Sequence, residues 1–235
     1  MTDIIITVAV VALLIAVSFK IYLTIKQKRE DRKLLATVTR LDRGTWSERD
    51  LVLQLLKHGI HPKAIYHDLY VKKTEGKYSQ IDVVVATKAG IIVFEVKDYS
   101  GWIFGKGNQE QWTQVLAYGR EKYRFYNPVK QNDGHIQALK QRFTKNKDVP
   151  FYSVVVFYGT SILRNVSNIP ENTFVIHPNQ VVSILDSLQT KKSAAYGDKM
   201  EIICELEKAV ANGDDTTVIQ QHEEYCRKIS SKWEI

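Results

Sequence analysis

The stretch from Tyr78 to Tyr99 constrains the fold of this chain more than any other. It reads YSQIDVVVATKAGIIVFEVKDY and holds two short apolar runs, Ile81 to Ala86 and Ile91 to Val96, both rich in β-branched residues. Lys88-Ala89-Gly90 supplies a turn in which Gly90 is free to take positive φ. We therefore predict a β-hairpin. Because both strands are nearly continuously apolar, we expect other elements to cover both faces.

Three charged residues stand out in this hairpin: Asp82, Glu95 and Lys97. Side chains alternate along a strand, so Glu95 and Lys97 project from the same face. A turn of two or four residues places Asp82 opposite Glu95 on that face, whereas a three-residue loop places the two on opposite faces. The length of the turn therefore decides whether these charges form one group.

Two carboxylates side by side in a poorly solvated strand pair are unfavourable, because each opposes ionisation of the other. A hard divalent cation such as Mg²⁺ removes this repulsion and takes one or two carboxylates together with water and phosphate oxygens. Lys97 then stands beside the metal, where it orients a water or neutralises phosphate charge. The alternative is an ion pair of Lys97 with Glu95 or Asp82 and no further role.

The composition fits one α/β domain with additions at either end. The chain has 235 residues and a formal charge of +7, which suits nucleic acid or an anionic membrane surface and separates neither. Its two cysteines, Cys204 and Cys226, have neither the spacing of a disulfide pair nor that of metal ligands. Free cysteines suit a reducing compartment.

An apolar segment opens the chain. It runs from Ile4 to Ile25 with Lys20 inside it, which is about the length that crosses a bilayer. A cleavable signal peptide is the alternative, but no basic residues precede the run and no small-residue cleavage site follows it. Lys26 to Lys33 are largely basic, so we expect a single-pass protein of the cell membrane with its C-terminal domain in the cytoplasm.

The first helix of the domain is predicted from Ser47 to about His58. Ser47 and Asp50 have the form of a capping box. Glu48 falls on the same face as the apolar residues Leu51, Val52 and Leu55. An acid there either compensates the helix dipole or points at the hairpin as a third carboxylate.

Two further segments carry candidate binding residues. Arg120, Lys122 and Arg124 alternate along a predicted strand and form a basic row suited to a phosphate backbone, or simply a solvated face. Asn127-Pro128 then predicts a helix start, and the helix extends to about Phe143. Its Gln131 and His135 are neighbours that would contact a phosphate or the edge of the site, and a structural role for His135 is the alternative.

The remaining chain predicts two strands and three helices. The strands are Phe151 to Tyr158, which we place centrally, and Asn172 to Ile176. A helix follows His177-Pro178, and two more run over Lys199 to Val210 and Thr216 to Ile229. We divide the chain into an anchor (1–25), a juxtamembrane linker (26–44), a core (45–165) and a C-terminal strand and helical extension (166–235).

An ordered set of residues resembles the bacterial nuclease-related domain family, a branch of the PD-(D/E)xK nuclease superfamily. The set covers about Glu48 to Leu139. It consists of Ser47-Glu48, His67-Asp68-Leu69, Gln80-Ile81-Asp82, Gly90-Ile91, Phe94-Glu95-Val96-Lys97, Ser100-Gly101-Trp102-Ile103, Trp112, and Asn127-Pro128 with Gln131 and His135. Ser47 stands where the family often has Gly. A single N-terminal membrane helix also fits the family.

The resemblance implies an α/β fold like that of restriction endonucleases, with a mixed central sheet flanked by helices. Here it would be preceded by one transmembrane helix and followed by C-terminal helices. The resemblance carries over Asp82 and Glu95 as metal ligands and Lys97 as the catalytic lysine. Glu48 would be the carboxylate of the first helix, and Gln131 the polar residue of the later one.

Together these observations predict a membrane-anchored, Mg²⁺- or Mn²⁺-dependent hydrolase of phosphodiester bonds in DNA. Asp82 and Glu95, with Glu48, would hold the metal, while Arg120, Lys122, Arg124 and His135 would contact DNA. The alternative is a non-catalytic, membrane-tethered module that binds nucleic acid or a protein.

Overall fold

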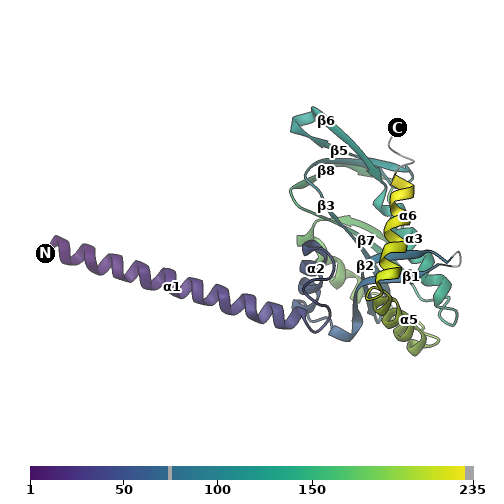
Figure 1. Ribbon diagram of the computed structural model, residues 1–235, viewed down its shortest axis with the longest axis horizontal. Helices are drawn as coiled ribbons and strands as arrows, with labels where there is room; N and C mark the ends of the chain where they lie inside the picture. Colours follow the sequence, from purple (N-terminus) through teal and green to yellow (C-terminus); the bar gives the residue numbers. More distant parts are fainter. Residues whose placement is uncertain (74–75, 231–235) are drawn as a thin grey trace.

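The computed structural model describes residues 1–73 and 76–230, apart from the side chains of residues 3–5, 8–10, 12 and 228–230. Its centre is a five-stranded mixed sheet in the order β1-β2-β3-β7-β9 (Figure 1). These strands are β1 (Ile65–Lys72), β2 (Tyr78–Thr87), β3 (Gly90–Asp98), β7 (Phe151–Tyr158) and β9 (Thr173–Ile176). The first three pair antiparallel, and β3, β7 and β9 run parallel. The predicted mixed α/β sheet is confirmed.

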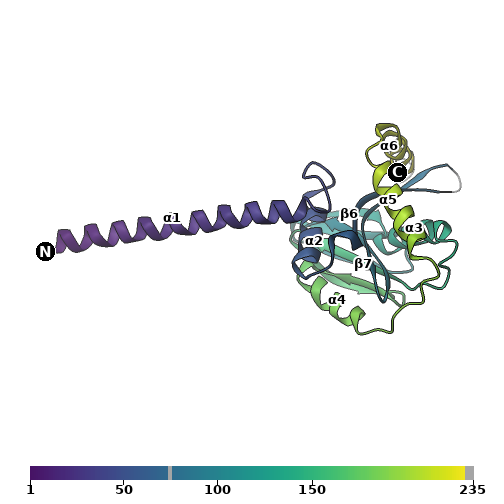
Figure 2. The same ribbon diagram turned by 90° about the horizontal axis from the view of Figure 1, so that it is seen from below.

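Helices cover both faces of this sheet, as the apolar strands require. On one face, α2 (Trp46–Lys57) and α4 (Val181–Gln189) pack on side chains that include Val83 and Val85. On the other face, α3 (Pro128–Arg142) and α5 (Lys199–Asn212) pack on the alternate residues, among them Val84 and Val93. Figure 2 shows α4 and α5 on opposite sides of the domain. Because successive side chains of β2 point to opposite faces of the sheet, they are divided between two separate hydrophobic cores.

A second, four-stranded sheet has the order β6-β5-β4-β8. Its strands are β4 (Gly101–Lys106), β5 (Gln111–Leu116), β6 (Glu121–Tyr126) and β8 (Ser161–Ser167). The predicted strand that carries Lys122 and Arg124 is confirmed as β6, but β8 was not predicted. It is an edge strand that pairs only with β4, and most of its side chains are at least partly exposed, so its sequence lacks an apolar run. The ring of Trp112 stacks on Phe157 at 6.1 Å and joins the two sheets.

The hairpin turn holds two residues, Lys88 and Ala89, between β2 and β3. Gly90 follows with φ of 142°, a conformation that side chains disfavour. A Cβ atom at Gly90 would also clash with the carbonyl oxygen of Pro150. Both features explain why glycine ends this turn.

The N-terminal segment forms one helix, α1 (Thr2–Leu35), of 34 residues. It projects from the domain as a long rod (Figures 1 and 2). Its last turn joins the domain, because Leu35 is buried in the core beside α2 and Asp31 pairs with Lys57 at 2.8 Å. The predicted linker is therefore largely a continuation of the helix.

The predicted transmembrane helix from Ile4 to Ile25 is wrong. Within the described part of the chain, no helix combines the length and the apolarity that crossing a membrane requires. Helix α1 is long, but only part of it is apolar. Lys20 interrupts the apolar sequence, and charged residues follow from Lys26. The side chain of Ile4 lies outside the described residues. The expected single-pass location at the cell membrane, which depended on this helix, is wrong as well.

The N-cap of helix α2 lies two residues earlier than predicted. Thr45, not Ser47, is its N-cap, and the Thr45 hydroxyl oxygen accepts a hydrogen bond from the Glu48 amide at 3.3 Å. Ser47 instead donates to the Asp98 carboxylate at 2.7 Å. The prediction failed because Thr45 with Glu48 forms the better capping box.

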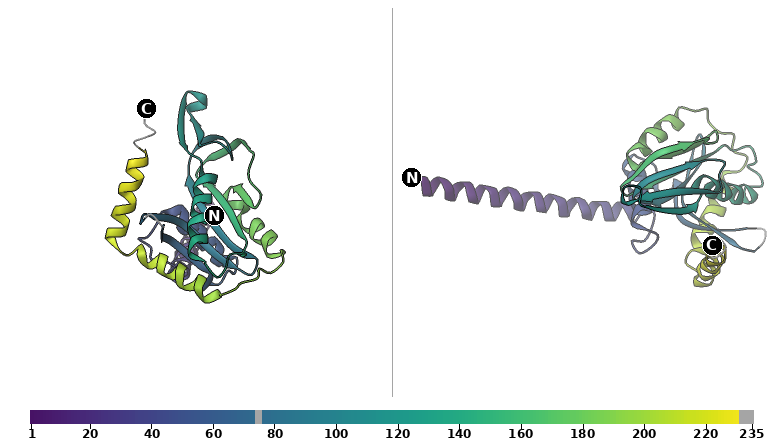
Figure 3. Two further views of the ribbon diagram at one scale, coloured as in Figure 1. Left: turned by 90° about the vertical axis from the view of Figure 1, so that its right-hand side faces the viewer. Right: turned by 90° about the horizontal axis from the view of Figure 1, so that it is seen from above.

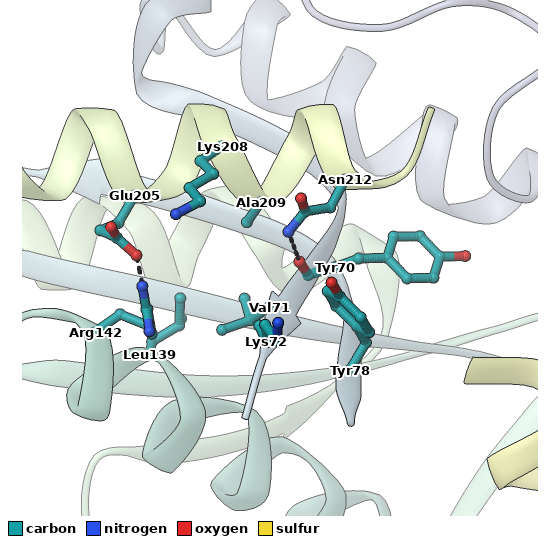
Figure 4. Close-up of a pocket in the computed structure, with 10 residues that line it drawn as sticks. All are labelled: Tyr70, Val71, Lys72, Tyr78, Leu139, Arg142, Glu205, Lys208, Ala209 and Asn212. Atoms are coloured by element: carbon teal, nitrogen blue, oxygen red, sulfur yellow. Dashed lines mark hydrogen bonds and ion pairs between the residues drawn. The ribbon is translucent and has the colours of Figure 1, made fainter. Parts of the chain in front are cut away.

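The C-terminal helices follow the predicted pattern. After the short helix η3 (Pro178–Gln180), α4 starts at Val181, and α5 and α6 (Thr216–Ser230) occupy the two later predicted helical segments. The other short helices are η1 (Pro62–Ala64) and η2 (Ala117–Gly119). A cavity of about 190 Å³ lies between α5, α3 and the β1–β2 pair (Figure 4). None of the predicted site residues lines it, and an Arg142–Glu205 ion pair at 2.7 Å ties α3 to α5 at its edge.

We expect Gly90→Ala to lower the free energy of unfolding by about 2–4 kcal/mol, because it combines positive φ with a backbone clash. The matched control is Gly134→Ala on α3, where nothing lies near the added methyl group. That change should stabilise the protein by about 0.5–1 kcal/mol. Chemical denaturation of both variants checks the opposite signs, and equal effects would contradict the assigned turn geometry.

Candidate functional site

The two-residue turn places Asp82 opposite Glu95. Val83 pairs with Phe94 in the antiparallel register, so the next position along brings Asp82 and Glu95 face to face. Lys97 lies two residues beyond Glu95 on the same strand and therefore on the same face. The structure thus brings the three charges of the hairpin together on the side of the sheet that α3 covers.

Glu95 is buried, at 1% exposure, and both of its oxygens have partners. Oε1 lies 2.6 Å from the Lys97 ammonium, and Oε2 lies 3.1 Å from Nε2 of His135 on α3. Burial acts to raise the pKa of Glu95, but the charges and hydrogen bonds of Lys97 and His135 outweigh it and lower the pKa. Glu95 is therefore held as an anion.

Asp82 has the opposite electrostatic environment. Its Oδ2 accepts a hydrogen bond from the Val96 amide at 2.6 Å. Burial raises the pKa of Asp82 well above its usual range, and the negative charges of Glu95 and Glu48 raise it further. Lys97 and the Val96 amide offset only part of this effect. The charge of Asp82 is thus left largely uncompensated by the protein.

Glu48 reaches the site from the first turn of α2, where it is buried. Its Oε1 accepts a hydrogen bond from the Thr45 hydroxyl at 2.8 Å. Its Oε2 lies 3.3 Å from Nε2 of His67 but has no hydrogen bond of good geometry. Burial raises the pKa of Glu48, yet His67 and Thr45 outweigh it and the pKa is lowered. Nδ1 of His67 is in turn fixed by the Thr39 hydroxyl at 2.8 Å.

A local distortion of β1 lies beside Asp82. The β1–β2 pairing includes His67 and Leu69 but skips Asp68, the residue opposite Asp82. Asp68 has φ of 54°, and its carboxylate accepts hydrogen bonds from Arg43 at 2.9 Å and Gln80 at 2.8 Å. These bonds hold a backbone conformation that is unfavourable for a residue with a side chain.

The other predicted residues are divided between two places. His135 lies inside the site, buried, with Nδ1 2.8 Å from the Ser79 hydroxyl as well as its contact to Glu95. Gln131 lies half-buried one helical turn earlier on α3. Arg120, Lys122 and Arg124 lie on the second sheet, at the start and along the length of β6, and are exposed. The structure does not bring these three cations into contact with the carboxylates.

The donor set fits a divalent metal in ligand type and charge. Asp82 and Glu95 offer hard carboxylate oxygens, and Mg²⁺ is often held by one or two carboxylates plus waters and phosphate oxygens. The raised pKa of Asp82 and the buried Oε2 of Glu48 without a hydrogen bond mark negative charge that a cation would offset. Among the described residues, however, no three of the His, Cys, Asp and Glu side chains lie close enough to hold a metal together. Glu48 therefore lies near Asp82 and Glu95 and acts on Asp82 through its charge, but the three carboxylates do not form one metal-binding group.

Residues 43–158 match the family model of the nuclease-related domain. This segment is a nuclease-related domain. A protein of Bacillus anthracis that is described as uncharacterized is 31% identical over 130 residues, which are 54% of this chain. The match covers 59% of that relative's length. No solved structure matches the chain at a significant level. The resemblance in the sequence is confirmed, and the mixed sheet is consistent with a restriction-endonuclease-like fold.

Sequence reasoning missed the contacts that orient the carboxylates of the nuclease-related domain. The pairs His135–Glu95 and His67–Glu48 each join side chains from two different elements. No local pattern specifies which histidine faces which acid. The one available signal was the presence of both histidines in the set of residues that resembles the family.

We expect Asp82→Asn to stabilise the metal-free protein at neutral pH by roughly 1–3 kcal/mol, the usual scale of a single buried change. The native state binds the Asp82 proton more tightly than the unfolded state, because the native pKa is raised. Stability of the unmodified protein should therefore fall as pH rises above about 4 until the raised pKa is passed. Asp82→Asn should abolish this fall.

Thermal melting in EDTA at several pH values measures the effect, with Asp148→Asn as a control because Asp148 is exposed. Added Mg²⁺ or Mn²⁺ should raise the melting midpoint of the unmodified protein and leave that of Asp82→Asn unchanged. Destabilisation by Asp82→Asn in EDTA would show that the charge of Asp82 is well compensated and would contradict the metal assignment.

Proposed function

We propose that this nuclease-related domain hydrolyses phosphodiester bonds in DNA with the help of Mg²⁺ or Mn²⁺. The observation that carries the proposal is the placement of Asp82 opposite Glu95, with the Lys97 ammonium 2.6 Å from Glu95. Two acids and a lysine on one face of a strand pair match the requirements of phosphodiester hydrolysis. These are ligands for a divalent cation and a positive group for the developing charge.

In this proposal Asp82 and Glu95 hold the metal ion, and Glu48 adds negative charge beside them. The bound ion would supply a water of lowered pKa and neutralise charge on the phosphate. Gln131, half-buried on α3 one turn before His135, is assigned to hydrogen bonding at the edge of the same site.

Lys97 acts as a cation and hydrogen-bond donor. Burial lowers the pKa of Lys97, but the charges of Glu95 and Asp82 outweigh it and raise the pKa. Lys97 therefore stays protonated at neutral pH and has no free lone pair with which to remove a proton from water. Its role is to orient the attacking water or to stabilise negative charge on a phosphate oxygen.

The partners of the two glutamates act as positioning residues. Ser79 and His135 form a chain of contacts at 2.8 and 3.1 Å that ends on Glu95. Thr39 and His67 form a second chain, at 2.8 and 3.3 Å, that ends on Glu48. Such partners fix the orientation of a ligand side chain and commonly account for roughly 10- to 100-fold of affinity or activity.

A specific observation favours a second candidate, a module that binds nucleic acid or protein without cleaving it. Both oxygens of Glu95 are occupied, by Lys97 and His135, as they would be in a structural ion pair. A domain that kept these charges only for its fold would show the same contacts.

We expect the full chain to cleave DNA in Mg²⁺ or Mn²⁺ and not in EDTA. Glu95→Gln and Lys97→Arg should each lower the rate by about 100-fold or more, because each removes charge or geometry used in the transition state. Linear, circular and single-stranded DNA serve as substrates, and gel electrophoresis shows whether ends or interiors are cut. The control is Lys88→Arg, an exposed lysine in the turn at the other end of the hairpin.

Absence of metal-dependent cleavage by the folded, unmodified protein would refute the enzyme and favour the binding module. Cleavage that survives in both variants would instead show that the reaction uses other residues. Melting curves of each variant confirm that lost activity is not lost folding.

A further inference from the structure

The tip of the β5–β6 hairpin has an unusual backbone. Three consecutive residues have positive φ: Ala117 at 47°, Tyr118 at 55° and Gly119 at 99°. The Tyr118 side chain is 97% exposed, so the ring packs against almost nothing. In Figure 3 (left) the hairpin projects above the rest of the domain. The chain therefore adopts an unfavourable backbone at the position that presents an aromatic ring to the solvent.

Among the residues that the structure describes, the Tyr118 ring makes no packing contacts that would offset the unfavourable backbone of Ala117 and Tyr118. Positive φ is unfavourable for a residue with a side chain, and such conformations cluster at ligand-binding positions. The loop holds four residues, Ala117 to Arg120, and of its three positive-φ positions only Gly119 carries one of the residue types, Gly, Asn and Asp, that suit this conformation. The hairpin thus departs from the favourable turn sequence at the very residue that is most exposed.

Three basic residues follow Tyr118 closely in the sequence. Arg120 follows the tip, and Lys122 and Arg124 project from one face of β6, opposite Val115 and Thr113. Within the described residues none of these three cations forms a salt bridge. The acidic neighbour Glu121 alternates to the other face and accepts a hydrogen bond from the Tyr123 hydroxyl at 3.1 Å. The face that carries Lys122 and Arg124 is therefore electropositive and open.

The base of the hairpin contacts the segment that directly follows β3, the strand that carries Glu95 and Lys97. Gln114 on β5 donates a hydrogen bond to the Ser100 carbonyl at 2.8 Å, just after the end of β3. A Cβ atom at Gly101 would clash with Val115, which shows how closely β4 and β5 approach there. From Lys97 through these contacts to Tyr118, the chain spans no more than about 30 Å. One strand of nucleic acid bridges that distance with about nine nucleotides or fewer, since even the compact rise of the duplex is roughly 3.4 Å per nucleotide.

We propose that this tip binds single-stranded DNA, with Tyr118 stacked on an unpaired base and Arg120, Lys122 and Arg124 against the phosphates. An exposed tyrosine ring offers a flat face that any base can stack on, and exposed arginines and lysines follow the backbone. Alternate residues on a strand lie about 6.6 Å apart, so Lys122 and Arg124 can each contact a different phosphate of one strand. The inference rests on the proposed function, because it names the form of DNA that the same domain engages.

The test measures binding without cleavage. Fluorescence anisotropy of the full chain is recorded in EDTA with a labelled single strand of about 20 nucleotides, which exceeds the roughly nine needed to reach the site. A duplex of the same sequence is the second probe. Tyr118→Gly should weaken binding to the single strand by about 5- to 100-fold, as expected for the loss of one stacked base. It should weaken duplex binding much less.

Tyr118→Gly also separates function from folding, because glycine accepts positive φ. Its melting midpoint should be unchanged or raised while its affinity falls. Tyr118→Trp, which keeps an aromatic face, should bind the single strand as the unmodified protein does. The matched control is Tyr22→Gly, an exposed tyrosine on α1, for which no loss of affinity is expected. Helix α1 projects away from the domain that carries the hairpin (Figure 1).

The inference is overturned if Tyr118→Gly binds the single strand normally, or if it loses affinity equally for both forms of DNA. It is also overturned if the unmodified protein binds no DNA at low salt. These results are distinguishable from failure of the proposed function. A protein that shows the expected binding pattern but never cleaves DNA in Mg²⁺ or Mn²⁺ would refute the hydrolase and leave the binding tip standing.

Discussion

Repulsion between Asp82 and Glu95 is the interaction on which the rest of the site depends. The register of β2 and β3 forces the two acids onto one face of a sheet whose surroundings are apolar. The protein compensates one acid only: Lys97 and His135 lower the pKa of Glu95, while burial and neighbouring acids raise the pKa of Asp82. Paired acids whose pKa values are pushed apart are common at sites that act on a ligand, so this asymmetry supports the proposed function.

The elements around this pair are arranged to hold it. Helix α3 brings His135 onto Glu95, and the first turn of α2 brings Glu48 to its neighbourhood. The distortion at Asp68 lies opposite Asp82 and is fixed by Arg43, whose guanidinium also donates to the backbone carbonyl of Val210 at the end of α5. The C-terminal helices therefore help to fix the strand beside the site, although they contribute no predicted site residue.

The sequence was sufficient for the features that local signals specify. The hairpin followed from two apolar runs around a glycine turn, and the start of α3 followed from Asn127-Pro128. It was not sufficient for β8, whose exposed edge position gives no apolar pattern, or for the histidine contacts, which depend on tertiary packing. The expected membrane helix failed because a count of apolar residues gave too little weight to Lys20 and the charges that follow.

One buried residue connects the site with the second sheet. Asn127 is fully buried, and its side-chain oxygen caps α3 by accepting a hydrogen bond from the Val129 amide at 2.9 Å. The side-chain nitrogen of Asn127 donates to the carbonyls of Gly107 and Gln109 in the β4–β5 turn at 3.0 and 2.7 Å. Helix α3 positions His135 against Glu95, and β5 carries the hairpin that presents Tyr118. Because one side chain fixes the beginning of both, the carboxylates and the exposed basic hairpin keep a defined relation to each other.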